Sequence, residues 1–271
     1  MSVLSLKDLL KLPFNVPSIP RVVAVLLTEL DSPQPDLRKI TQHIGTDPAL
    51  TLRLLQTANG DSFKLCGQIH SVSEALALLS LGDVKTMAQA AAASASLKAV
   101  PGMALPQFWE YSLNVAKVAR SLATVVRLNQ QAAYTCGLVH AMGELAMHLA
   151  MPHNMAQLDA SVPPLSLKRA RAERQLLRYT WAAVGAGHAR QWQFPQVLVD
   201  ALEHQHAPFE NDVYEPLAGV IHLATWRARC KEAHLGEREM AVTFPGFVGE
   251  VLGLDIDMVL QQDPFDWAAH T

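Results

Sequence analysis

Hydrophobic residues recur at helical spacing along nearly all of this 271-residue chain. In the segment 21–30, for example, Val23, Leu26 and Leu30 fall on one face at intervals of three and four residues. No stretch shows the sustained alternation of apolar and polar residues that is typical of a half-buried strand. The pattern therefore predicts an all-α fold, with roughly a dozen helices.

Helix start and stop signals divide the first hundred residues into short helices. Asp47-Pro48 opens one of them, because Asp47 can cap and Pro48 stands in the first turn, where its missing N–H costs nothing. Asn59-Gly60 ends that helix. Ser71 and Glu74 form a capping box, in which Glu74 is expected to reach back to the Ser71 backbone. A helix rich in Ala and Ser is expected over residues 84–97.

The segment 99–106, Ala-Val-Pro-Gly-Met-Ala-Leu-Pro, is the best candidate for a boundary, because prolines and glycine interrupt helices. We expect an N-terminal helical layer over residues 1–100 and a second helical subdomain over residues 105–271. Helices of the second part are expected at 108–128, 130–150, 166–179, 180–193, 195–204 and 216–232, with a last short one near 256–262.

Composition narrows the classes of function. The 22 basic and 25 acidic residues nearly balance, which argues against a broad nucleic-acid surface. Cys66, Cys136 and Cys230 are odd in number and far apart in sequence, so neither a disulfide framework nor a cysteine-rich zinc site is expected. We find no signal peptide and no uninterrupted apolar span of about 20 residues. The sequence thus predicts a cytoplasmic protein without a membrane anchor.

Four blocks, in this order and spacing, resemble the HDOD family, a helical relative of the HD phosphohydrolases found in bacterial signalling. The likeness covers most of residues 5–230 and implies an HD-like bundle with an N-terminal helical layer. The blocks are Leu12-Pro13 with Ile19-Pro20, the segment 44–59 (Ile-Gly-Thr-Asp-Pro-Ala to Thr-Ala-Asn), the segment 69–82 (Ile-His-Ser-Val-Ser-Glu to Ser-Leu-Gly), and Phe108-Trp109 followed by 133–140 (Ala-Tyr-Thr-Cys-Gly-Leu-Val-His).

The resemblance also indicates where metal ligands of an HD hydrolase would stand. The His-Asp pair of such enzymes falls on His140-Ala141, and a methyl group has no lone pair for a cation. Of the expected ligand positions only His140 and His206 keep a donor, and two neutral imidazoles without a carboxylate make a poor site for Mg²⁺ or Mn²⁺. We therefore expect no catalytic residues, no metal and no cofactor, but a vestigial cleft. Its expected residues are Tyr111, His140, Ala141, Trp181, His206 and Thr225.

Two other clusters need weighing. His140, Glu144 and His148 recur every four residues, so they share a helix face, and such a pair can chelate Zn²⁺ or Ni²⁺. We favour a packed histidine at 140 and ordinary polar-face residues at 144 and 148. Arg171, Arg174 and Arg178 form a basic helix face, which we interpret as solvated rather than as a phosphate or nucleic-acid site.

The function expected from the resemblance is a non-catalytic regulatory module of bacterial signal transduction that acts through protein–protein contact. No receiver, kinase or cyclase segment is attached, so signalling partners would be recruited in trans. A nucleotide-like ligand in the vestigial cleft could tune the module without turnover. The alternative is a metal-dependent phosphohydrolase with a rearranged site, built on His140, Glu144 and His206.

Overall fold

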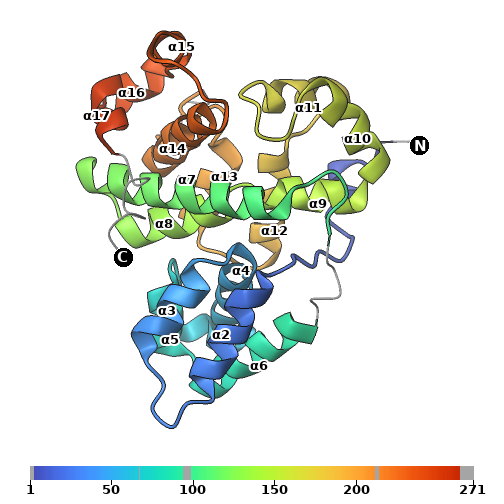
Figure 1. Cartoon of the computed structure of the whole chain (residues 1–271), viewed down its shortest axis with the longest axis vertical. Helices are drawn as coiled ribbons and strands as arrows, with labels where there is room; N and C mark the ends of the chain where they lie inside the picture. The colour runs from blue at the N-terminus through green and yellow to red at the C-terminus, as the bar shows by residue number, and fades with distance from the viewer. Residues whose placement is uncertain (1–2, 67, 94–98, 211–213, 263–271) are drawn as a thin grey trace.

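The computed structural model describes residues 3–66, 68–93, 99–210 and 214–262, and it confirms the all-α prediction (Figure 1). Within these residues the only β-type pairing is an isolated bridge between Val100 and Met103. The helices up to residue 93 are α1 (Leu6–Leu9), α2 (Pro20–Leu30), α3 (Leu37–Gly45), α4 (Pro48–Ala58), α5 (Val72–Leu78) and α6 (Leu81–Ala93), with a 3₁₀ turn at Asp61–Cys66.

The remaining helices form the upper body in Figure 1. They are α7 (Leu105–Val125), α8 (Gln130–Val139), α9 (Met142–Ala150), α10 (Pro152–Ser161), α11 (Arg169–Leu177), α12 (Trp181–Gln191), α13 (Gln196–His204), α14 (Pro216–Glu232), α15 (Glu237–Thr243), α16 (Gly246–Leu252) and α17 (Ile256–Gln261). Helix α7 crosses this body and packs against α8 and α14, while α12 packs against α9 and α13.

The helices α2–α6 form what we call the lower body, below α7 in Figure 1. Two buried polar side chains join separate sequence blocks there. Asp47 caps α4 by accepting the N–H groups of Ala49 and Leu50, and its other oxygen accepts the N–H of Ile19 at 2.6 Å. Asn59 closes a pair of hydrogen bonds with the backbone of Ile69, both 3.0 Å long. These residues, which the sequence marks as helix start and stop signals, therefore also hold distant segments together.

The N-terminal segment packs on the upper body rather than with α2–α6. The carbonyl of Leu4 accepts a hydrogen bond from the Tyr179 hydroxyl at 2.9 Å. Leu10 lies directly over Gly187 of α12, where a Cβ would come within 2.6 Å of the leucine side chain. The first part of the expected layer 1–100 thus contacts α12, and α2–α6 form the lower body on their own (Figure 1).

Several helix predictions hold and several do not. The helix 216–232 has the predicted ends, but the predicted helix 130–150 is broken at His140-Ala141 into α8 and α9. The reason is a tertiary contact, because α9 starts afresh where Gly143 lies against the backbone of Trp181 in α12. In the predicted capping box, Ser71 caps α5 as expected, but the Glu74 carboxylate accepts a hydrogen bond from the N–H of His70 rather than from that of Ser71. Helices α1, α10, α15 and α16 were not predicted, and residues 94–98 of the predicted helix 84–97 lie outside the described residues.

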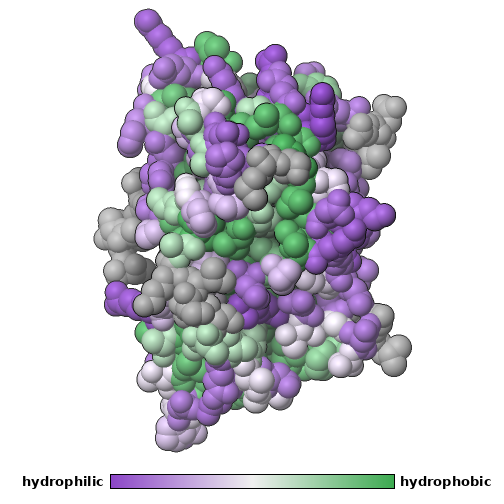
Figure 2. All heavy atoms as spheres, turned by 90° about the vertical axis from the view of Figure 1, so that its right-hand side faces the viewer, coloured by the Kyte–Doolittle hydropathy of each residue, from purple (hydrophilic) through white to green (hydrophobic). Residues whose placement is uncertain are grey.

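The surface carries both hydrophilic and hydrophobic residues. On the face seen in Figure 2, hydrophilic side chains project outermost, and hydrophobic ones lie between them, mainly in the upper body. Among the described residues, no helix has both the length and the apolar character needed to cross a bilayer. Cys136 and Cys230 are buried free thiols.

Candidate functional site

Four of the six residues expected in the vestigial cleft touch one another at the centre of the upper body. Tyr111 of α7, His140 at the end of α8 and Trp181 of α12 are fully buried, and His206 follows α13. The rings of Tyr111 and His140 lie 5.3 Å apart, those of His140 and Trp181 5.6 Å, and those of Trp181 and His206 4.4 Å, between centroids. With Arg229 of α14, these residues form what we call the cleft cluster.

The other two expected residues lie beside this cluster. Ala141 is buried between α8 and α9. Thr225 is buried on α14, one helical turn before Arg229, so the two share a face of that helix. Arg229 itself was not predicted. The only signal for it is its spacing of four residues from Thr225, and sequence alone does not show that the arginine is buried.

A chain of hydrogen bonds runs through the cleft cluster. Arg229 Nε donates to the Tyr111 hydroxyl at 3.1 Å, and that hydroxyl lies 3.2 Å from His140 Nε2. His140 Nδ1 lies 2.7 Å from the carbonyl oxygen of Gly137. A carbonyl can only accept, so Nδ1 carries the proton and Nε2 accepts from Tyr111. Both nitrogens of His140 are therefore engaged within the protein.

Electrostatics in the cleft cluster favour neutral side chains around one fixed cation. Burial lowers the pKa of His140 to about 3, and the charge of Arg229 acts in the same direction. Burial and Arg229 likewise lower the pKa of His206 well below its ordinary value. Arg229, 5% exposed, stands with its Cζ 5.8 Å from the Trp181 ring centre, and no carboxylate among the described residues forms an ion pair with it.

This donor set does not fit a divalent cation. The lone pair of His140 Nε2 accepts the hydrogen bond from Tyr111. The side chains of Ala141 and Trp181 offer no lone pair for a metal. The guanidinium of Arg229 would repel a second positive charge. The remaining unpartnered atoms include Trp181 Nε1, a donor only, and His206 Nε2.

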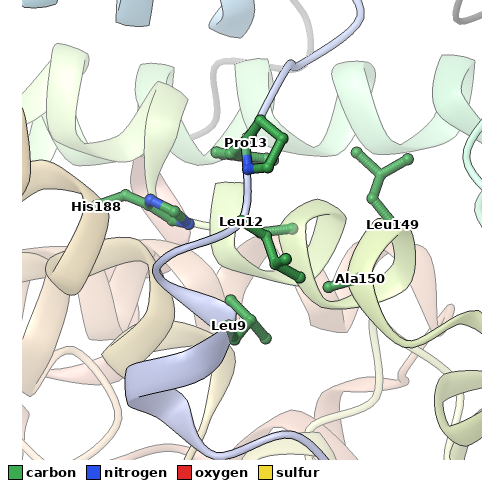
Figure 3. Close-up of a pocket in the computed structure, with 8 residues that line it drawn as sticks. Leu9, Leu12, Pro13, Leu149, Ala150 and His188 are labelled. Carbon is green, nitrogen blue, oxygen red and sulfur yellow. The ribbon is translucent and has the colours of Figure 1, made fainter.

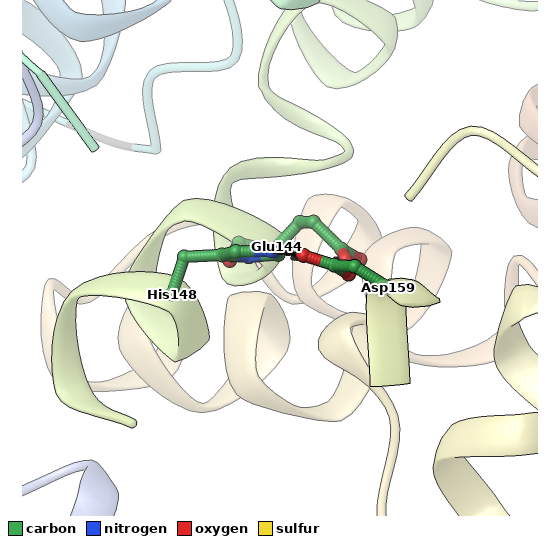
Figure 4. Close-up of side chains that lie close together, drawn as sticks. All are labelled: Glu144, His148 and Asp159. Atoms are coloured by element: carbon green, nitrogen blue, oxygen red, sulfur yellow. Dashed lines mark hydrogen bonds and ion pairs between the residues drawn. The ribbon is translucent and has the colours of Figure 1, made fainter. Parts of the chain in front are cut away.

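A second cluster, the buried ion network, lies where α9, α10 and α11 meet. Arg169 is fully buried and places its guanidinium 2.7 Å from a Glu144 oxygen, 2.8 Å from Asp159 and 2.9 Å from Glu173. His148 Nε2 lies 3.0 Å from Asp159. Figure 4 shows the side chains of Glu144, His148 and Asp159 turned toward one another. The network thus joins three helices through charged groups of both signs.

The network corrects our reading of Glu144 and His148 as ordinary polar-face residues, since they are 2% and 0% exposed. Glu144 and His140 also belong to different clusters: Glu144 lies against Arg169, whereas the ring nitrogens of His140 face Gly137 and Tyr111. By contrast, Arg171 and Arg174 on α11 and Arg178, which follows that helix, are exposed, as a solvated face predicts. Burial and the charge of Glu173 raise the pKa of Glu144 to about 8, while the charge of Arg169 acts in the opposite direction.

The ion network also positions the cleft cluster. Glu173 Oε1 pairs with Arg169, and its Oε2 accepts the backbone N–H of Trp181 at 2.9 Å, at the first turn of α12. A carboxylate at the N-terminus of a helix also meets the positive end of the helix dipole. The start of α12, and with it the Trp181 ring, is therefore fixed by a residue outside the cleft.

A separate apolar cavity of about 260 Å³ lies between the N-terminal segment and α9 and α12. Figure 3 shows Leu9, Leu12 and Pro13 on one side, Leu149 and Ala150 on another, and His188 at its edge. The His188 ring stacks on Phe14 with centroids 4.9 Å apart. Apart from His188, the side chains that line this cavity are apolar, so the imidazole is its one polar side chain.

Several solved structures share the fold of this chain. The response regulator MmoQ of Methylococcus capsulatus Bath is 23% identical, with a TM-score of 0.71 over 92% of this chain and 98% of that one. A virulence factor of Campylobacter jejuni is 16% identical, with a TM-score of 0.65 over 98% and 100%. A Shewanella amazonensis protein whose name suggests a phosphohydrolase is 24% identical, with a TM-score of 0.56 over 96% and 93%.

The sequence also matches the model of one protein family. Residues 16–208, well over half of the chain, match the model of the HDOD domain, and the chain belongs to the HDOD family. An uncharacterized protein of Treponema pallidum is 23% identical over 225 residues, which are 79% of this chain and 42% of that protein. The chain therefore spans less than half of the length of that curated relative.

Proposed function

We propose that this chain is a non-catalytic signal-transduction module that regulates other signalling proteins by direct contact. The observation that carries the proposal is the chain of bonds from Arg229 through Tyr111 to His140, which engages the ring nitrogens of the histidine that the resemblance to HD hydrolases would assign to a metal. Membership of the HDOD family and the likeness in fold to a response regulator support it. Its partners are recruited in trans in the bacterial cytoplasm.

The proposal includes a ligand role for the cleft cluster without turnover. Trp181 Nε1 and His206 Nε2 are buried and unpartnered, and Arg229 supplies a positive charge beside them. A nucleotide-like molecule offers the acceptors and the flat ring that such a set can bind. Calorimetry with a nucleotide panel tests this role, and a complete absence of heat would remove it while leaving regulation by contact in place.

Metal content and hydrolysis test the central claim together. Protein purified without tag or chelator should hold less than about a tenth of an equivalent of Mn, Fe, Zn or Ni by elemental mass spectrometry. With added Mn²⁺ it should not hydrolyse bis(p-nitrophenyl) phosphate or cyclic dinucleotides. Turnover that needs metal and disappears in His140→Ala would overturn the proposal. Folding of that variant is checked by circular dichroism.

A second candidate is a metal-dependent phosphohydrolase with a rearranged site. One observation favours it: Glu144, His148 and Asp159 each offer a ligand atom, and these atoms lie within 4.8 Å of one another. Against it, Arg169 already pairs with both carboxylates, and a cation would have to displace this guanidinium. Metal at one equivalent that is lost in Asp159→Asn but kept in His140→Ala would favour this candidate over the first.

A further inference from the structure

A second cavity, of about 330 Å³, opens where the lower body meets the upper one. It is lined by α3 and α5 from below and by α7 and α8 from above, pairs that lie one over the other in Figure 1. Its volume falls in the range of small-molecule sites. None of its lining residues belongs to the cleft cluster or to the ion network, so this cavity is a separate place in the fold.

The lining of this junction cavity carries positive charges and no acidic side chain to balance them. Arg38 of α3 and Arg120 of α7 both reach it, and no lining residue is Asp or Glu. Neither arginine forms an ion pair with a carboxylate within the described part of the chain. The amides of Gln42 and Gln131 and the hydroxyl of Ser73 add neutral hydrogen-bonding groups. Such a set suits an anion with several oxygen acceptors.

The arginine from the upper body is held in place before any ligand arrives. The Cζ atom of Arg120 lies 5.2 Å from the ring centre of Tyr134 on α8. The Tyr134 hydroxyl donates to the carbonyl of Gly45, at the end of α3, at 2.8 Å. One tyrosine thus contacts a cationic lining residue and also ties the upper body to the lower one. Pre-organisation of this kind lowers the entropic cost of binding.

We propose that the junction cavity binds a small phosphate-bearing metabolite between Arg38 and Arg120. The two arginines come from different bodies of the protein, so one phosphate group that pairs with both bridges them. Binding therefore stabilises one arrangement of α3 and α5 against α7 and α8. This site does not depend on the cleft cluster, and it supplies a ligand input to the module whether or not the cleft binds anything.

Calorimetry on the full chain with inorganic pyrophosphate and with AMP tests the proposal. We expect binding to at least one probe, weakened about tenfold or more in Arg38→Gln and in Arg120→Gln, because each loses a charge-assisted contact. Arg171→Gln, which removes an exposed charge on α11, is the matched control and should bind like the wild type. Hydrogen exchange should slow in α3 and α8 when the probe is bound.

Three outcomes would overturn the proposal. One is the absence of heat with either probe at millimolar concentration. Another is binding that both cavity variants retain at full strength. The third is binding lost in Arg229→Gln but not in Arg120→Gln, since that result would assign the ligand to the cleft cluster. Thermal unfolding of each variant shows whether a loss of binding comes from the site or from a loss of folding.

Discussion

Arg229 Nε donates to the hydroxyl of Tyr111 across 3.1 Å, and through that hydroxyl a permanent positive charge is linked to the imidazole of His140. The link uses the only free lone pair of that imidazole, the one a metal ligand would need. This chain of hydrogen bonds joins side chains of α14 and α7 to the residue that ends α8, so it adds to the packing between these helices.

Removal of the Tyr111 hydroxyl should destabilise the protein. Tyr111→Phe keeps the ring but leaves Arg229 Nε and His140 Nε2 buried without their shared partner. We expect a loss of about 1–3 kcal/mol in the free energy of unfolding, measured by urea denaturation. Tyr214→Phe is the control, because Tyr214 is 66% exposed. Equal stability of Tyr111→Phe and the wild type would show that this bond chain contributes nothing.

Glu144 should make stability fall as the pH rises. Its ordinary pKa is 4.5, and burial with the charge of Glu173 raises it to about 8 in the folded protein. Between these values the folded state binds more protons than the unfolded state, so the stabilisation from Glu144 is present below 4.5 and is lost as the pH rises through 8.

A comparison with Glu144→Gln isolates this effect from that of other groups. The amide has no proton to lose, so the wild type should lose stability relative to the variant between about pH 5 and pH 9. Denaturation curves across that range give the difference directly. Glu250→Gln, an exposed change on α16, should show no such trend. A constant difference between wild type and Glu144→Gln would contradict the raised pKa.

Asp47 should contribute more to the free energy of unfolding than a helix cap alone does. Asp47→Ala removes the acceptor of three backbone N–H groups, those of Ile19, Ala49 and Leu50. We expect a loss of about 2 kcal/mol or more, because the cap is lost and buried donors stay unpaired. Asp36→Ala, the matched exposed cap, should cost about 1 kcal/mol or less. Similar losses for the two variants would mean that the bond to Ile19 is not stabilising.

The sequence predicted the helices well where their ends carry local signals. Pro216 begins α14 as expected, since proline favours the first turn. It failed where tertiary contacts decide, as at His140-Ala141, where nothing local ends a helix. For the cleft, the spacing of the family blocks placed four residues that the fold brings into contact. Arg229 and Arg169 were missed, because a buried arginine is defined by partners from other helices.

Gly143 gives the sharpest test of the contact between α9 and α12. A Cβ at this position would overlap the carbonyl oxygen of Trp181 and lie 2.7 Å from the N atom of Gly185, both backbone atoms of α12. Neither can turn aside as a side chain could, so Gly143→Ala must push the two helices apart. We expect a loss of about 3 kcal/mol or more in thermal or chemical unfolding.

The same substitution should also disturb the cleft cluster, because Trp181 is the residue that Gly143 touches. Near-ultraviolet circular dichroism of the tryptophans should change in Gly143→Ala even where the far-ultraviolet spectrum shows an intact fold. Gly246→Ala is the matched control, since no atom lies within 4 Å of a Cβ there, and it should stay within about 1 kcal/mol of the wild type. If the two alanine variants behave alike, α9 and α12 are not in the close contact described.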